Sequence, residues 1–98
     1  MSKITKFAKG KQCTARIPDV CNFDPETTVW AHIRMVRYGA GWAKKPSDLV
    51  GLIACSNCHD VIDGRTQSEH SRDEIAIAQY EGHCESLLLL ELHGLIKT

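Results

Sequence analysis

The sequence predicts one small domain of the α+β class. A segment rich in β-branched and aromatic residues, 27–36, is typical of a strand, and a long apolar segment, 71–95, is typical of a helical cover. The 98 residues are near the lower size limit for a chain stabilised by a single hydrophobic core. Because 43% of the residues are hydrophobic but only 6% are aromatic, the core is expected to be thin. We therefore expect disulfides or a metal ion to stabilise the fold further.

The first two thirds of the chain are expected to contain short elements joined by loops. Residues 1–11 are polar and basic, which predicts a loose arm or a short strand. Ser47 is expected to cap a short helix or turn that leads into Cys55. A second short helix is expected over residues 57–64, because Gly64 supplies a stop signal.

The last third carries the clearest helix pattern. Ser71 and Glu74 have the spacing of a capping box, in which each side chain bonds to the backbone N–H of the other residue. The apolar residues that follow predict helix as far as Gly94, with a break at Gly82 as an alternative. The predicted role of this segment is to cover the core.

Four of the five cysteines are candidate ligands of a structural zinc ion. Cys55 and Cys58 have knuckle spacing, whereas Cys13 and Cys21 are separated by seven residues on an earlier turn. Four thiolates from two loops complete the tetrahedral site that Zn²⁺ prefers. A redox disulfide or buried free thiols remain as alternatives, and Cys84 is expected to be a small buried apolar residue.

The predicted location is the cytoplasm, with no membrane association. The number of cysteines is odd, and the N-terminal residues lack the apolar run of a signal peptide. The longest purely apolar run, 87–90, is far shorter than a membrane span. In the reducing cytosol, paired cysteines more often bind a metal than each other.

A zinc site built from a loop, a hairpin and the start of a helix is a treble clef. On that plan a helix begins at the second cysteine pair, so that His59 and Asp63 share one helical face. His32 lies on the preceding predicted strand and can point at that face. Two imidazoles and a carboxylate suit a divalent ion with open coordination positions. His59 could instead support the knuckle or replace a cysteine as zinc ligand, whereas His70, His83 and His93 are expected to have neither partner nor role.

Several motifs in residues 13–66 together resemble a known family. The order of two cysteines, "AHIR" and "IACSNCHDVID" is similar to the HNH, or His-Me finger, endonuclease motif with a treble-clef zinc. The motifs "RIPDVCN", "PET" and "DGRT" make the chain resemble more closely the YbcO-like nucleases of phages and prophages. The resemblance implies that His32 is the general base and that His59 binds a catalytic divalent ion, usually Mg²⁺. Asp63 is then the candidate second ligand or an orienting group.

The chain departs from the usual HNH pattern at two points. Ala31 stands where the motif has an Asp or His ligand, and the asparagine that orients the base has no clear counterpart. Ser47, Asp48 and Asn57 are imperfect candidates for that asparagine. His32 could therefore be a metal ligand and not a base. The expected organisation is a single HNH-like zinc domain over 1–98, with the arm at 1–11, the zinc core at 13–66 and the cover at 71–95.

The charge distribution points to DNA as a partner. Residues 1–45 carry nine Lys or Arg against three acids, and residues 46–98 carry three against nine, although the net charge is zero. Lys and Arg neutralise the phosphates that dominate affinity for nucleic acid. A zinc-stabilised nucleic-acid-binding module without catalysis is an alternative, as is an interaction domain whose leucine-rich end pairs with a partner or a second copy. The candidate phosphate contacts are Arg34, Arg37, Lys44 and Lys45.

Overall fold

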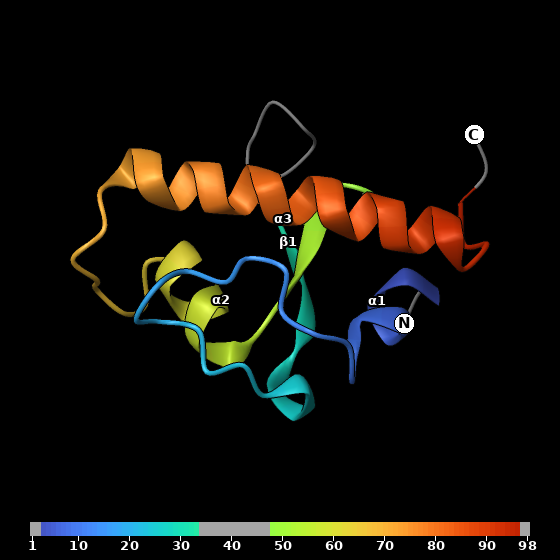
Figure 1. Ribbon diagram of the computed structural model, residues 1–98, viewed down its shortest axis with the longest axis horizontal. Coiled ribbons are helices and arrows are strands. Elements are labelled where there is room, and N and C mark those ends of the chain that lie inside the picture. The colour runs from blue at the N-terminus through green and yellow to red at the C-terminus, as the bar shows by residue number, and fades with distance from the viewer. Residues whose placement is uncertain (1–2, 34–47, 97–98) are drawn as a thin grey trace, which may run out of the picture.

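The computed structural model describes residues 3–33 and 48–96 of the protein. The short two-stranded sheet and the helices of these ranges confirm the α+β class. A long C-terminal helix lies across the sheet, with one short helix below each of its halves (Figure 1). In chain order the elements are α1 (Lys3–Ala8), the 3-10 turn η1 (Pro25–Thr27), β1 (Val29–His32), β2 (Gly51–Ala54), α2 (Ser56–Ile62) and α3 (Arg72–Leu92).

The two strands pair antiparallel, so that His32, the last residue of β1, lies opposite Gly51, the first residue of β2. The predicted strand over 27–36 is confirmed for Val29–His32, and residues 34–36 lie outside the described ranges. The prediction of a helix or turn before Cys55 is confirmed only for a turn at residues 48–50, and it is wrong for residues 51–54, which form β2. All four of its residues are buried, so the segment lacks the apolar–polar alternation that predicts a strand.

The sheet is buried on both faces, and each face contributes to a separate core cluster. Successive strand residues point to opposite faces, so Ala31 and Leu52 enter a different cluster from Trp30 and Ile53. The first core cluster also contains three of the four candidate zinc ligands and Val61 of α2. The second core cluster consists of the buried residues Ala8, Trp30, Ile53 and Leu90.

The prediction of a loose basic arm at the N-terminus is wrong, because Lys3–Ala8 forms α1. Ala8 is fully buried in the second core cluster, and Ile4 and Phe7 pack against that cluster. Apolar residues at i, i+3 and i+4 are enough to define one buried helical face. Lys3 and Lys6 therefore lie on the exposed face of a docked helix, and the charge of the segment concealed this pattern.

Helix α3 confirms the predicted capping box and rules out the break at Gly82. The Ser71 side chain accepts the Glu74 backbone N–H, and the Glu74 side chain accepts the Ser71 backbone N–H. Gly82 lies inside the unbroken helix, where a Cβ atom would approach Leu52 Cδ1 to 2.7 Å. This glycine therefore permits close packing of α3 on β2. The helix ends at Leu92, just before Gly94 with φ +77°.

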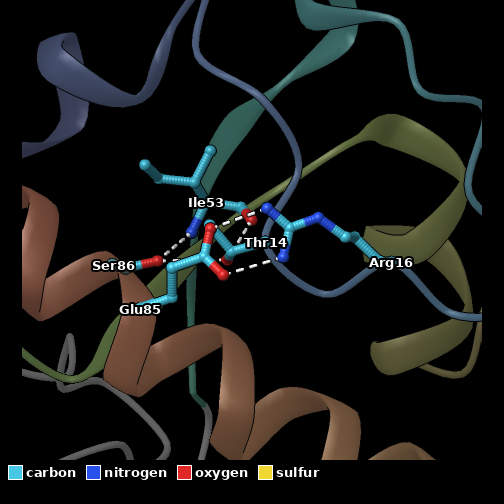
Figure 2. A network of polar contacts seen from close by, with 5 residues as sticks. All are labelled: Thr14, Arg16, Ile53, Glu85 and Ser86. Carbon is cyan, nitrogen blue, oxygen red and sulfur yellow. Dashed lines mark hydrogen bonds and ion pairs between the residues drawn. The ribbon is translucent and has the colours of Figure 1, made fainter.

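Side chains from distant segments satisfy the outward backbone groups of β2 (Figure 2). Ser86 of α3 accepts the Ile53 N–H at 2.9 Å, and the Ile53 carbonyl accepts the Thr14 hydroxyl at 2.7 Å. Arg16 and Glu85 form a two-pronged ion pair beside this network, with both N–O distances at 2.7 Å. An uncovered strand edge would expose unpaired backbone groups, and here α3 and the loop after Cys13 cover it.

Candidate functional site

The four cysteines predicted to bind zinc converge in the structure. Their sulfur atoms all lie within 4.8 Å of one another, which is close enough for one metal ion to contact all four. Cys55 is the N-cap of α2, and its Sγ accepts the Cys58 backbone N–H at 3.4 Å. The start of α2 thus supplies two ligands, and the loop before η1 supplies Cys13 and Cys21. All five cysteines are free, so the predicted disulfide alternative is not the state seen here.

The electrostatics of this group suit a cation. A hydrogen bond from the Cys58 thiol lowers the pKa of Cys13, whereas that hydrogen bond and burial raise the pKa of Cys58. Burial also raises the pKa of Cys21. Further negative charge among these buried sulfurs is thus unfavourable unless a cation compensates it. The donor set therefore fits a metal ion such as zinc, which binds thiolates and whose binding releases the thiol protons.

The loop that carries Cys13 and Cys21 has an unusual backbone. Arg16, Asp19 and Phe23 have φ values of +46°, +62° and +55°, a region that non-glycine residues rarely adopt. Such conformations persist only where the surrounding structure holds them in place. Here the loop is tied down by Thr14 on β2, by the Arg16–Glu85 ion pair and by the convergence of the cysteines.

His32 is held by a carboxylate that follows it in the chain. Its Nε2 lies 2.9 Å from Asp48 Oδ1, and the two side chains are 26% and 44% exposed. A carboxylate oxygen only accepts, so Nε2 carries the proton of this hydrogen bond, and in a neutral ring Nδ1 is then the acceptor atom. Asp48 is one of the three residues considered above as counterparts of the orienting asparagine.

His59 and Asp63 meet on one face of α2, as their spacing predicts. His59 Nε2 lies 3.1 Å from Asp63 Oδ2, and Asp63 is the C-cap of the helix. The same Oδ2 atom lies 2.5 Å from the guanidinium of Arg65, a residue that the sequence reasoning missed. Its signal in the sequence is weak, because a single arginine after a helix is common.

The structure does not join the histidines in one group. Among residues 3–33 and 48–96, the four cysteines are the one group of three or more metal-binding side chains within reach of a single ion. His32 pairs with Asp48, and His59 forms a separate pair with Asp63. The cysteine group does not include His59. The candidate phosphate contacts Arg34, Arg37, Lys44 and Lys45, as well as Ser47, lie outside the described residues.

The expectation that the other histidines lack partners is wrong. His83 donates its Nδ1–H to the Gly51 carbonyl at 2.6 Å, which covers β2 next to the strand position of His32. His70 donates its Nε2–H to the Pro18 carbonyl at 2.7 Å. His93 packs against the ring of Phe7, with ring centroids 5.1 Å apart. These contacts are structural.

A cleft among the described residues lies away from His32. Its volume is about 810 Å³, and it opens between the loop at 18–20, helix α2 and the loop at 66–70. Its charged lining is mainly acidic, with Asp19, Asp60, Glu69 and Glu74 beside His70. An acidic cleft repels phosphate, so it is not a candidate nucleic-acid site. In the described ranges, no helix has the length and apolar character needed to cross a bilayer.

Comparisons with known proteins agree with this architecture. Residues 2–94 match the family model described as "Putative nuclease YbcO". Relatives of that name occur in Escherichia coli (strain K12) and in Enterobacteria phage 82. Each is 53% identical over 66 residues, which are 67% of this chain and 68% of the relative.

A solved structure covers still more of the chain. It is titled "Structure of a putative bacteriophage protein from Escherichia coli str. K-12 substr. MG1655" and superposes with a TM-score of 0.79. The two sequences are 41% identical, and the match covers 93% of this chain and 99% of the other. On the strength of the family model and these relatives, the chain belongs to the family described as "Putative nuclease YbcO", which has a member in a phage.

Proposed function

We propose that this chain is a metal-dependent endonuclease of the HNH, or His-Me finger, type that hydrolyses phosphodiester bonds in DNA. The observation that carries the proposal is the contact between His32 Nε2 and Asp48 Oδ1 at 2.9 Å. A strand histidine oriented by a carboxylate has the arrangement of a general base. The names of the relatives, one of them from a phage, support a nuclease of phage or prophage origin.

In this proposal His32 takes a proton from the attacking water through Nδ1. Asp48 accepts the Nε2–H, which fixes the tautomer and stabilises the imidazolium that forms. His59 and Asp63 would hold a divalent ion, with Mg²⁺ as first choice. When bound, such an ion stabilises negative charge on the phosphoryl and leaving oxygens. Arg34, Arg37, Lys44 and Lys45 are the proposed contacts to the DNA backbone.

The fold proposed for this activity is a treble clef with Zn²⁺ at the four cysteines. The loop with Cys13 and Cys21, the β1–β2 hairpin and the start of α2 follow one another in the required order. Four sulfur ligands leave a zinc ion no open position, so this site has a structural role. The catalytic ion is therefore assigned to His59 and Asp63 and not to the cysteines.

Nicking of a supercoiled plasmid by the purified protein, with Mg²⁺ or Mn²⁺, tests the proposal. His32→Ala is expected to lose nicking by about a hundredfold or more, since a general base contributes about 10²–10⁴-fold. Asp48→Asn is expected to lose less, because the amide still holds the ring but stabilises the imidazolium poorly. His93→Ala, which lies at the far end of α3, is the matched control. Equal nicking by the parent and His32→Ala, with zinc retained, would contradict the assignment.

A non-catalytic nucleic-acid-binding module is the second candidate function. It is favoured by Ala31, which supplies no ligand beside His32, and by the separation of the two histidine pairs. Salt-sensitive DNA binding without divalent-dependent nicking would support this function over the nuclease.

A further inference from the structure

Arg65 has a fixed backbone beside the proposed catalytic ion site. Gly64, with φ +78°, follows the C-cap of α2, and its N–H donates to the Val61 carbonyl at 3.1 Å. The Arg65 N–H donates to the Asp60 carbonyl at 2.8 Å. These two hydrogen bonds form a Schellman motif, which satisfies the last carbonyls of the helix. The Arg65 backbone is thus anchored directly after the helix turn that carries His59 and Asp63.

The guanidinium of Arg65 forms ion pairs with the two aspartates next to this site. It lies 2.5 Å from Asp63 Oδ2 and 3.5 Å from Asp60 Oδ1. The Asp63 oxygen is the same atom that contacts His59 Nε2 at 3.1 Å. A divalent ion that binds Asp63 Oδ2 would compete with the guanidinium for this atom, because two cations next to one carboxylate oxygen repel each other.

The side chain is suited to a change of partner. Asp63 is 13% exposed, but Arg65 is 58% exposed, so the guanidinium can move to solvent without any rearrangement of the helix. Its charge does not depend on Asp63, because an arginine side chain stays protonated in proteins. An arginine fork matches phosphate oxygens in bidentate geometry and forms shorter, stronger hydrogen bonds than neutral donors form.

We propose that Arg65 is a phosphate-binding residue of the nuclease site. Until a divalent ion binds, its guanidinium is the counter-ion of Asp63 and Asp60. This inference rests on the function proposed above. When an ion binds at His59 and Asp63, the guanidinium leaves Asp63 and binds a backbone phosphate of the nucleic acid. Arg65 thus neutralises the carboxylates in the free protein and the substrate in the complex.

The test uses Arg65→Gln and two readouts that are expected to change in opposite directions. Calorimetric titration with Mn²⁺ alone should show tighter binding than in the parent, by about threefold to tenfold, because the competing cation is gone. Binding of a DNA duplex in Ca²⁺ should weaken by about tenfold, the effect of losing one charged hydrogen-bonding group. The slope of log affinity against log salt should fall by about 0.9, the value for one phosphate contact.

Arg72→Gln, at the exposed first residue of α3, is the matched control and should change neither readout by more than about twofold. Arg65→Lys keeps the charge but loses the fork, so its DNA binding should lie between those of the parent and Arg65→Gln. A purely structural role of Arg65 would weaken both kinds of binding together. DNA affinity in Arg65→Gln equal to that in Arg72→Gln would overturn the proposal.

Plasmid nicking by the parent, measured in parallel, separates this inference from the proposed function. If the parent nicks and Arg65→Gln binds DNA normally, the role of Arg65 is wrong and the nuclease assignment stands. If the parent does not nick but the opposite shifts in ion and DNA affinity occur, the nuclease assignment is wrong and the exchange of partners by Arg65 stands.

Discussion

The hydroxyl groups of Thr14 and Ser86 lie 3.1 Å apart, although 72 residues separate them in the chain. The Thr14 hydroxyl donates to the Ile53 carbonyl, so the contact between the two hydroxyls uses the Ser86 proton. Ser86 in turn accepts the Ile53 N–H. These three bonds close a ring that joins the cysteine-bearing loop, β2 and α3 (Figure 2).

We expect Ser86→Ala to destabilise the protein by about 1–3 kcal/mol, because it leaves the buried Ile53 N–H without an acceptor. The free energy of urea unfolding of the metal-loaded protein measures this effect. Thr66→Ala, at an exposed position after α2, is the control and should change stability by less than about 0.5 kcal/mol. Equal effects of the two substitutions would show that the ring contributes little.

Gly82→Ala is expected to destabilise the protein, although alanine favours a helix by about 1 kcal/mol over glycine. The new Cβ would approach Leu52 Cδ1 to 2.7 Å and Thr14 Oγ1 to 2.9 Å. Leu52 can shift, but Thr14 is held in the ring, so we expect a net loss of about 1–2 kcal/mol. Thermal unfolding measures this loss, with Glu81→Ala at an exposed position as the control. A gain in stability in Gly82→Ala would contradict the packing argument.

Removal of the metal should disrupt the structure around the cysteines. Binding of a structural zinc ion is worth about 10 kcal/mol or more, which is comparable to the whole stability of a small domain. Cys13→Ser should therefore lose bound metal and cooperative unfolding, and a chelator should do the same to the parent. Cys84→Ser, outside the cysteine group, should keep about one ion per chain. Metal analysis and circular dichroism report both properties, and a folded, metal-free Cys13→Ser would refute the prediction.

His70 should make the stability depend on pH. Its hydrogen bond to the Pro18 carbonyl, and then its contact with Glu74, raise the pKa of His70 above its usual value. Because the pKa of His70 is raised in the folded state, protonated His70 stabilises the protein. This stabilisation is fully present below the pKa of histidine in the unfolded chain, about 6.5. It is lost as the pH rises through the pKa of His70 in the folded protein. His70→Gln can still donate to Pro18 but does not titrate.

The urea midpoint of the parent should thus fall more than that of His70→Gln between about pH 6 and about pH 8. The thiols titrate in both proteins, so their effect cancels in the comparison. Parallel curves for the two proteins would show that the contact with Pro18 does not depend on the charge of His70.

The sequence predicts those parts of the fold that carry a local signal. The capping box of Ser71 and Glu74 marks the start of α3, and Gly64 marks the end of α2. β2 was misread because it is buried on both faces, and only its tertiary environment distinguishes such a run from a helix. Likewise α1 is too short to be recognised without the second core cluster on which it packs.

In the candidate site, too, the sequence predicts only the contacts that carry a local signal. The cysteine group follows from the spacing of two pairs, and the pairing of His59 with Asp63 follows from the helical period. The contact of His32 with Asp48 joins two residues that are 16 positions apart in the chain, and no local pattern predicts it. The Arg65 contacts depend on a backbone motif that re-aims the chain after α2. Contacts of this kind require the three-dimensional structure.

The division of the core into two clusters has a consequence for local opening of the fold. The first cluster contains three cysteines, whereas the buried residues of the second are Ala8, Trp30, Ile53 and Leu90. Partial loss of the metal should therefore open the cysteine loop and α2 as one cooperative unit. Because Trp30 and Leu90 pack without any sulfur ligand, amide protons at that end should keep their slow exchange with solvent. The domain would then unfold first at the end that carries the four cysteines.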